Sequence, residues 1–274
     1  MGKNNTIGSH TLVLEKDWKA ESVSEYGFIF EGNKTKFVDG RNHLIDGANK
    51  IAHLIEIHNC SDLVVSNVRF TRGNTNTLKK IPRKNIRFAV RRRSIFEIID
   101  GGAVVITGNS NVIFKNCAFY RNNSVMCGGA ISNQSTGKVK VIDCVFEENS
   151  AGHTGSAIDN LVRRASIEIE NCTFIRNKSN TWNNSGAPHG QISLFPHTSA
   201  HIIRSHFSGG SIPFDYHDGS TVTVVQNSYD GYNAWEEGNI THRRNSIFDK
   251  LHLLTHLYWI VPKTFGRVVY RVNV

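Results

Sequence analysis

The sequence predicts an all-β fold, a single-stranded right-handed parallel β-helix solenoid, and three observations support this prediction. A seven-residue motif, Asn/Asp-Cys-x-Phe-x-x-Asn, recurs at 116–122, 143–149 and 171–177, with cysteines 27 and then 28 residues apart. A small-residue signature, Gly-Gly/Ser-Ala-Val/Ile, precedes each copy. The intervening runs are short, β-branched and free of a helical stripe, which is typical of a repeat that buries its core only by stacking.

The strands are expected where apolar and polar residues alternate over four or five positions. Such runs occur at 54–57, 139–142, 167–169 and 221–224. They are too short for helices and are bounded by Gly, Asn and Ser, which favours three strands per turn joined by bends. Fainter copies of the motif extend the repeat in both directions, at 67–70, 204–207, 227–229 and 245–248.

Stacking the repeat places identical residues in columns along the axis. Rungs of a parallel stack lie roughly 4.8 Å apart, so equivalent side chains are in contact. We expect a phenylalanine column inside the solenoid and an asparagine ladder at the turn. The cysteines are Cys60, Cys117, Cys127, Cys144 and Cys172. A ladder of small buried thiols is the favoured interpretation, with a disulfide between one pair of neighbouring rungs as the alternative.

Two features carry a resemblance to known families. The pairing of Gly-Gly-Ala-Ile with Phe-x-x-Asn resembles the repeats of polymorphic outer-membrane proteins, and residues 37–47 are similar to the first rungs of pectate-lyase-like proteins. The resemblance covers roughly residues 28–250 and implies a right-handed parallel β-helix. That superfamily contains lyases, hydrolases, epimerases, phage tailspikes and non-catalytic adhesins, so the resemblance does not choose an activity.

The chain divides into a solenoid and two ends. We expect an N-terminal cap over 1–30, a β-helix over 31–250 with a basic loop insertion at 72–97, and a C-terminal cap over 251–274. The cap would begin with a helix near 247–260 and end in a strand at 268–272, because exposed strand edges need covering. Alternatively, this tail is an oligomerisation surface, which would make the protein a homo-oligomer.

Composition limits the location of the protein and the cofactors that it is expected to bind. Without a run of about 20 apolar residues, no membrane span is expected. The start lacks the apolar core of a secretory signal, yet the fold favours an extracellular location or a cell or virion surface. Without a Cys-x-x-Cys pair, a structural zinc site is not expected.

The positive charge is concentrated in one stretch. The chain carries a formal charge of +9, and residues 63–96 contain ten Lys or Arg and no acid. This stretch predicts contact with an acidic polysaccharide or another polyanion, although a solvated loop or an acidic neighbouring subunit would also explain it. The residues expected to bind substrate are Arg83, Lys84, Arg91, Arg92, Arg93, Arg163, Arg164 and Trp182.

Aligning the small-residue signatures brings polar side chains into one stripe. The candidate catalytic residues are His189, His217, Tyr216, Asp159, Asp215 and Arg204. A base and a cationic neutraliser suit β-elimination of a uronic-acid polymer, whereas two carboxylates such as Asp159 and Asp215 suit glycoside hydrolysis. A calcium site from Asp159, Asn133 and Asn160 is a further hypothesis, because all three offer oxygen ligands. The opposing interpretation is that Asn and Asp merely cap bends.

These observations predict a carbohydrate-active β-helix protein that binds an acidic polysaccharide and cleaves it by β-elimination if it is an enzyme. The alternative is a non-catalytic, adhesin-like surface protein or a virion structural protein that uses the same surface for binding only.

Overall fold

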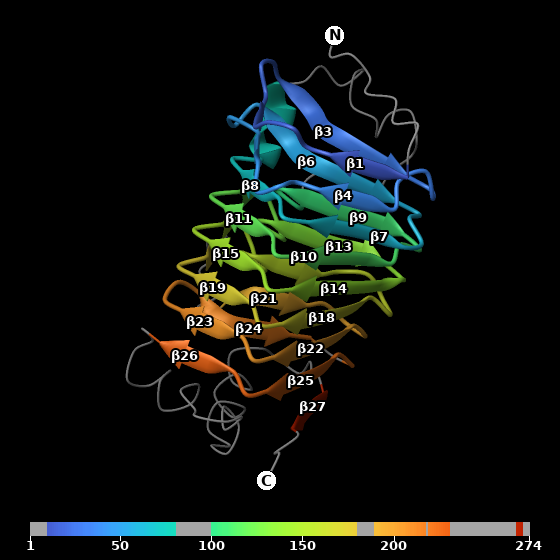
Figure 1. Ribbon diagram of the computed structural model, residues 1–274. Helices are drawn as coiled ribbons and strands as arrows, with labels where there is room; N and C mark the ends of the chain where they lie inside the picture. The colour runs from blue at the N-terminus through green and yellow to red at the C-terminus, as the bar shows by residue number, and fades with distance from the viewer. Residues whose placement is uncertain (1–9, 81–99, 180–188, 218, 231–266, 271–274) are drawn as a thin grey trace.

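The computed structural model describes residues 10–80, 100–179, 189–217, 219–230 and 267–270. These residues form a parallel β-helix, as the repeat predicts, whose strands stack along one axis from the N-terminal to the C-terminal end (Figure 1). Every paired strand in the described residues runs parallel to its partners. The successive strands of each coil therefore belong to different sheets.

Two sheets carry the first two strands of each coil. Sheet A contains β1 (Thr11–Val13), β4 (Phe37–Asp39), β7 (Leu63–Ser66), β10 (Val112–Lys115), β14 (Lys138–Ile142), β18 (Ser166–Glu170), β22 (Ser199–Ile203), β25 (Thr221–Val225) and β27 (Arg267–Tyr270). Sheet B contains β2 (Trp18–Lys19), β5 (Leu44–Asp46), β8 (Arg69–Thr71), β11 (Ala118–Tyr120), β15 (Val145–Glu147), β19 (Thr173–Ile175), β23 (His206–Ser208) and β26 (Ser228–Asp230).

The remaining strands close the coil. The short sheet D contains β12 (Asn123–Ser124), β16 (Ser150–Ala151) and β20 (Lys178–Ser179). Sheet C contains β3 (Ser24–Glu31), β6 (Ile51–His58), β9 (Val104–Gly108), β13 (Ile131–Ser135), β17 (Ile158–Asn160), β21 (Gly190–Leu194) and β24 (Ile212–Tyr216). A 3₁₀ helix, η1 (Thr75–Lys80), follows β8 and contacts β3 and β6. A complete coil thus runs through sheets A, B, D and C.

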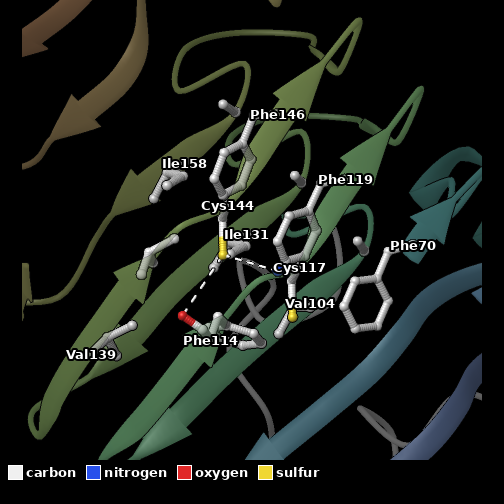
Figure 2. Packing of buried hydrophobic residues seen from close by; sticks show 14 of the residues in the cluster. Phe70, Val104, Phe114, Cys117, Phe119, Ile131, Val139, Cys144, Phe146 and Ile158 are labelled. Carbon is white, nitrogen blue, oxygen red and sulfur yellow. Dashed lines mark hydrogen bonds between the residues drawn. The ribbon is translucent and has the colours of Figure 1, made fainter. Parts of the chain in front are cut away.

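The predicted phenylalanine column is confirmed. Phe70, Phe119, Phe146 and Phe174 are fully buried, and their rings stack with centroid separations of 4.7–4.9 Å. Figure 2 shows the first three of these rings one above another. The column continues through Phe207, whose ring lies 4.7 Å from that of Phe174. Because each ring meets an identical ring one coil away, the register between coils is fixed by the packing of the core.

The predicted asparagine ladder is also present, and it is buried. The backbone N–H and the side-chain amide of Asn122 both donate to Asn149 Oδ1 at 3.0 Å. Asn149 repeats this arrangement with Asn177 Oδ1, at 3.0 Å from its N–H and 2.9 Å from its side-chain amide. Each side-chain amide also donates to a phenylalanine carbonyl one coil back, which for Asn149 is Phe119 O at 2.9 Å. The ladder thereby satisfies the backbone groups that the turn between sheets B and D leaves unpaired.

All five cysteines are free and buried, which excludes the disulfide alternative. Cys117, Cys144 and Cys172 form the expected column at the turn between sheets A and B. The N–H of Cys117 donates to Cys144 Sγ at 3.4 Å, and the Cys144 thiol donates to Phe114 O at 3.7 Å (Figure 2). Cys60 lies at another turn, where its N–H donates to Ser110 Oγ. Cys127 belongs to neither position.

The N-terminal end differs from a simple cap. The described part of the segment expected to form the N-terminal cap supplies β1, β2 and β3, which pair with β4, β5 and β6, so it is a coil of the solenoid. At the other end, β27 pairs with β25 across the stretch where a final strand was expected. The predicted capping helix lies outside the described residues. No described helix is long and apolar enough to cross a membrane.

Asn149→Ala should destabilise the fold by on the order of 3 kcal/mol, because it leaves buried donors and acceptors on two neighbouring coils unpaired. Asn109→Ala is the matched control, since Asn109 is exposed and only its backbone N–H makes a hydrogen bond in the described residues. Urea unfolding of both variants measures the difference. Equal stability of the two variants would show that the ladder does not hold the coils together.

Candidate functional site

The interruptions of the repeat occur at one corner of the solenoid. We call this place the D–C corner; it comprises residues 100–103, 125–130, 152–157 and 189, which lead into sheet C. One insertion, 81–99, lies between η1 and Asp100, and the other, 180–188, lies between β20 and His189. Both insertions are outside the described residues. The coils of β13 and β17 pass between their attachment points, so the corner is the region that both insertions flank.

The outward column of sheet C contains the expected stripe. Ser132 pairs with Asp159, Asp159 with Ser193, and Ser193 with Asp215. Their neighbours Ile131, which lies in β13, and the equivalent residues of β17 and β21 point into the core, so this column lies on the other face of the sheet. Ser132, Asp159 and Ser193 are nevertheless fully buried, because the D–C corner covers them, and only Asp215 is partly exposed. Asp159 and Asp215 lie two coils apart, or about 10 Å, as the sequence alignment predicts.

Three imidazoles gather beside this column. The rings of His153 and His189 have centroids 5.0 Å apart. The pKa of His153 is lowered, mainly by burial and then by the neighbouring His189, with a smaller contribution from His217. All three side chains are half-buried, which leaves part of each ring accessible. The lowered pKa favours the neutral imidazole at pH 7, which is the form that accepts a proton.

Asp215 is held in place by the D–C corner. The Thr154 hydroxyl lies 3.0 Å from both Asp215 Oδ1 and Oδ2 and donates to this carboxylate. The N–H of Gly190 donates to Oδ1 at 3.3 Å. The negative charge of Asp215 opposes the lowering of the His153 pKa, which places the carboxylate within electrostatic reach of the imidazoles. Carboxylate and imidazoles thus form one cluster, which we call the imidazole cluster: His153, His189, Asp215 and His217.

A second pair of carboxyl groups lies deeper. Asp100 and Asp159 are fully buried. Burial raises the pKa of Asp100 to about 7. Burial and the negative charge of Asp100 raise the pKa of Asp159. Between them lies Cys127, whose thiol pKa is raised by burial and by both carboxylates, and whose Sγ is 3.9 Å from His153 Nδ1.

Two predicted members of the site lie elsewhere. Tyr216 follows Asp215 on β24, so its side chain takes the opposite face and packs against the hydrophobic core, where burial raises its pKa to about 12. Arg204 occupies the turn between β22 and β23, far round the coil from sheet C, and forms an ion pair with Glu170. Neither side chain belongs to the imidazole cluster.

The predicted cationic residues are only partly described. Arg163 and Arg164 are exposed in the turn after β17, and neither makes an ion pair with another described residue. Because the chain extends at most about 3.4 Å per residue, the backbone of this turn lies within about 17 Å of that of Asp159. The other predicted substrate-binding residues lie outside the described residues: Arg83, Lys84, Arg91, Arg92, Arg93 and Trp182.

The calcium hypothesis does not fit the structure. Asn133 and Asn160 share the inward column of sheet C, and the Asn133 amide donates to Asn160 Oδ1 at 2.6 Å. The Asn160 amide donates to the carbonyls of Ala165 and Ser199. Asp159 lies on the other face of the same strand, so the three side chains cannot converge on one ion. Among the described residues, no group of three or more His, Cys, Asp or Glu side chains is arranged to hold a metal.

Sequence reasoning did not select Asp100, Cys127 or Thr154 as site residues. The three occupy equivalent positions of successive coils, since the N–H of Gly101 donates to Cys127 O and the N–H of Gly128 donates to Thr154 O. Their place immediately before each small-residue signature was a usable signal. A comparison with protein-family models, curated proteins and solved structures found no match to this chain.

Gly128→Ala should destabilise the fold by about 2 kcal/mol more than Gly32→Ala. Both glycines have φ of +64°, so both substitutions carry the same backbone strain of about 1 kcal/mol. An added Cβ meets nothing within 4 Å at Gly32, whereas at Gly128 it would lie 2.0 Å from Asp159 Oδ1 and 2.6 Å from Ile131 O. Thermal or urea unfolding compares the two. Equal destabilisation would contradict the close packing of Asp159 over Gly128.

Proposed function

We propose that the protein binds an acidic polysaccharide at the imidazole cluster, beside sheet C, and cleaves it there by β-elimination. The observation that carries this proposal is the convergence of three half-buried histidines and Asp215 at the D–C corner and the adjoining end of sheet C. The parallel β-helix and residues 37–47 support membership of the pectate-lyase-like superfamily, whereas the Gly-Gly-Ala-Ile repeats resemble those of polymorphic outer-membrane proteins and favour the non-catalytic alternative. A protein with such a substrate would act outside the cell or at a cell or virion surface.

The chemistry of β-elimination matches the groups present. A base must remove the proton next to the uronate carboxylate, a cation must neutralise that carboxylate, and an acid must protonate the glycosidic oxygen as its bond to the sugar carbon breaks and a C=C bond forms. The lowered pKa of His153 supplies a neutral imidazole at pH 7, with His189 and His217 as further candidates to contact the substrate. Arg163 and Arg164, in the turn between β17 and β18, are the exposed cations nearest along the chain to the stripe. The first insertion, which contains further basic residues, is attached at the D–C corner.

Glycoside hydrolysis is less well supported. That reaction needs two carboxyl groups that reach opposite sides of the same glycosidic bond. Asp159 and Asp215 lie two coils apart, at a separation compatible with the reaction. However, Asp159 is fully buried, and its Oδ1 lies over Gly128, toward the preceding coil and away from Asp215. A buried carboxyl group that leans away from its partner cannot protonate a bound glycosidic oxygen.

A panel of uronic-acid polymers, incubated with and without calcium, tests the proposal through the absorbance of the unsaturated product. His153→Ala, His189→Ala, His217→Ala and Asp215→Asn should each lower kcat/KM, by about 10²–10⁴-fold for the residue that transfers the proton. His201→Ala is the matched control, because His201 lies on sheet A in register with Glu168 and Thr223. Salt-sensitive binding without product on any polymer would favour the non-catalytic surface-protein alternative and overturn the lyase proposal.

The activity should also persist on mild acidification. Because the pKa of His153 is lowered from its ordinary value of 6.5, the neutral imidazole remains the major form as the pH falls to 6.5. The acidic limb of the kcat/KM profile should therefore lie below pH 6.5. Because the charge of Asp215 raises the pKa of His153, Asp215→Asn should move this limb to still lower pH. A profile whose acidic limb lies above pH 6.5 would exclude His153 as the base.

A further inference from the structure

Two carboxyl groups at the D–C corner have no part in the proposed reaction. Asp100 and Asp159 are fully buried, and each has one oxygen, Asp100 Oδ2 and Asp159 Oδ1, without a hydrogen-bond partner. Within the described residues, no Lys or Arg forms an ion pair with either group. A buried carboxylate without a cation is strongly disfavoured, whereas a protonated carboxyl group can donate from the oxygen that is otherwise unpaired.

The two groups approach the same coil from opposite sides. Asp100 belongs to the coil of β9, and its Oδ1 accepts the N–H of Cys127 at 2.9 Å. Asp159 belongs to the coil of β17, and its Oδ1 lies 2.0 Å from the Cβ position of Gly128. Although the residues are two coils apart along the solenoid, their carboxyl groups converge on two consecutive residues of the coil between them. Their charges consequently interact, which contributes to the raised pKa of Asp159.

The neighbouring elements add little positive charge to offset two carboxylates. From β13, the Ser132 hydroxyl donates to Asp159 Oδ2 at 3.2 Å. The corner before β13 contributes the Cys127 thiol, and the corner before β17 contributes His153, whose lowered pKa favours its neutral form. Asp215 of β24 adds a further negative charge, and His189 and His217 are close enough to His153 to lower its pKa. From β6, the buried imidazole of His53 has its Nδ1 2.9 Å from Gly101 O. These surroundings favour retention of a proton by the buried pair.

We propose that Asp100 and Asp159 form a proton-operated lock, which keeps the D–C corner closed while at least one of them is protonated. Loss of the proton at higher pH leaves two like charges in a buried space on either side of Cys127 and Gly128. Their repulsion and their demand for water then open the corner between the two insertions. This proposal goes beyond the proposed function and stands whether or not the protein cleaves a polysaccharide.

The direction of the pH effect follows from linkage. The ordinary carboxyl pKa of 3.8 applies in the unfolded chain, whereas burial raises that of Asp100 to about 7 in the fold. Between pH 3.8 and about 7 the folded protein therefore holds a proton that the unfolded chain releases. The contribution of the pair to stability is complete below pH 3.8 and decreases as the pH rises through this window. One such proton increases the unfolding constant about tenfold for each pH unit.

Urea unfolding of the full chain between pH 5 and pH 8.5 tests the lock. Asp159→Asn and Asp100→Asn should each flatten the fall in stability with pH that the wild type shows. Asp143→Asn is the matched control, because Asp143 occupies an exposed column in which Asn116 and Asn171 are its equivalents. It should retain the wild-type pH dependence. Identical pH dependence in all four proteins would overturn the proposal.

Two further measurements use the folded wild-type protein and do not depend on whether the variants fold. The infrared spectrum of the wild type at pH 6 should contain the carbonyl band of a protonated carboxylic acid, and its absence would overturn the proposal. Alkylation followed by peptide mapping should show that labelling of Cys127, relative to Cys144 in the same molecule, rises above pH 7. Both thiols are buried in the described structure. A constant labelling ratio across this range would show that the corner does not open.

Discussion

The buried asparagine ladder is the interaction on which the other features depend. Asn149 accepts two hydrogen bonds from Asn122 and donates to Phe119 O and Asn177 Oδ1, so a single side chain joins consecutive coils. A slip of one residue in any of the three coils that contain Asn122, Asn149 and Asn177 would leave these groups unpaired in the interior, where each unpaired group is costly. Extra residues can therefore be inserted only where they do not shift the ladder asparagines out of register. The D–C corner meets this condition, and both insertions enter there.

Much of the fold could be predicted because the ladder and the aromatic stack use the same residues in the three central coils. Phe119, Phe146 and Phe174 are 27 and 28 residues apart, a pattern that the printed sequence displays directly, together with the cysteines beside them. The corner has no such requirement, and its equivalent positions hold Asp100, Cys127 and Thr154, which share no chemistry. Their proximity follows from coil register, and each residue considered alone carries no signal.

For the predicted site residues that the structure places elsewhere, the sequence already indicated their true positions. Arg204 stands in the motif position of Asn116 and Asn171, where the chain turns between sheets A and B, so the repeat itself assigns it to that turn. Tyr216 follows Asp215 within a strand, and alternation assigns the two to opposite faces. Asn133 and Asn160 are separated from Asp159 for the same reason. Side-chain burial of the acids, by contrast, depends on the loops of neighbouring coils and could not be predicted from alternation.

The architecture also explains how the fold tolerates two buried acids. In a solenoid each coil contacts only its neighbours, so an unfavourable group weakens the adjacent interfaces and leaves distant ones intact. Asp100 and Asp159 lie on either side of a single coil, and that coil is held independently at its far turn by Asn122 and by the Phe119 ring. The absent side chain of Gly128 makes room for the carboxyl group of Asp159. The unfavourable burial of these two acids therefore affects the D–C corner alone. A change in their protonation can displace the corner and leave the packing of the core unchanged.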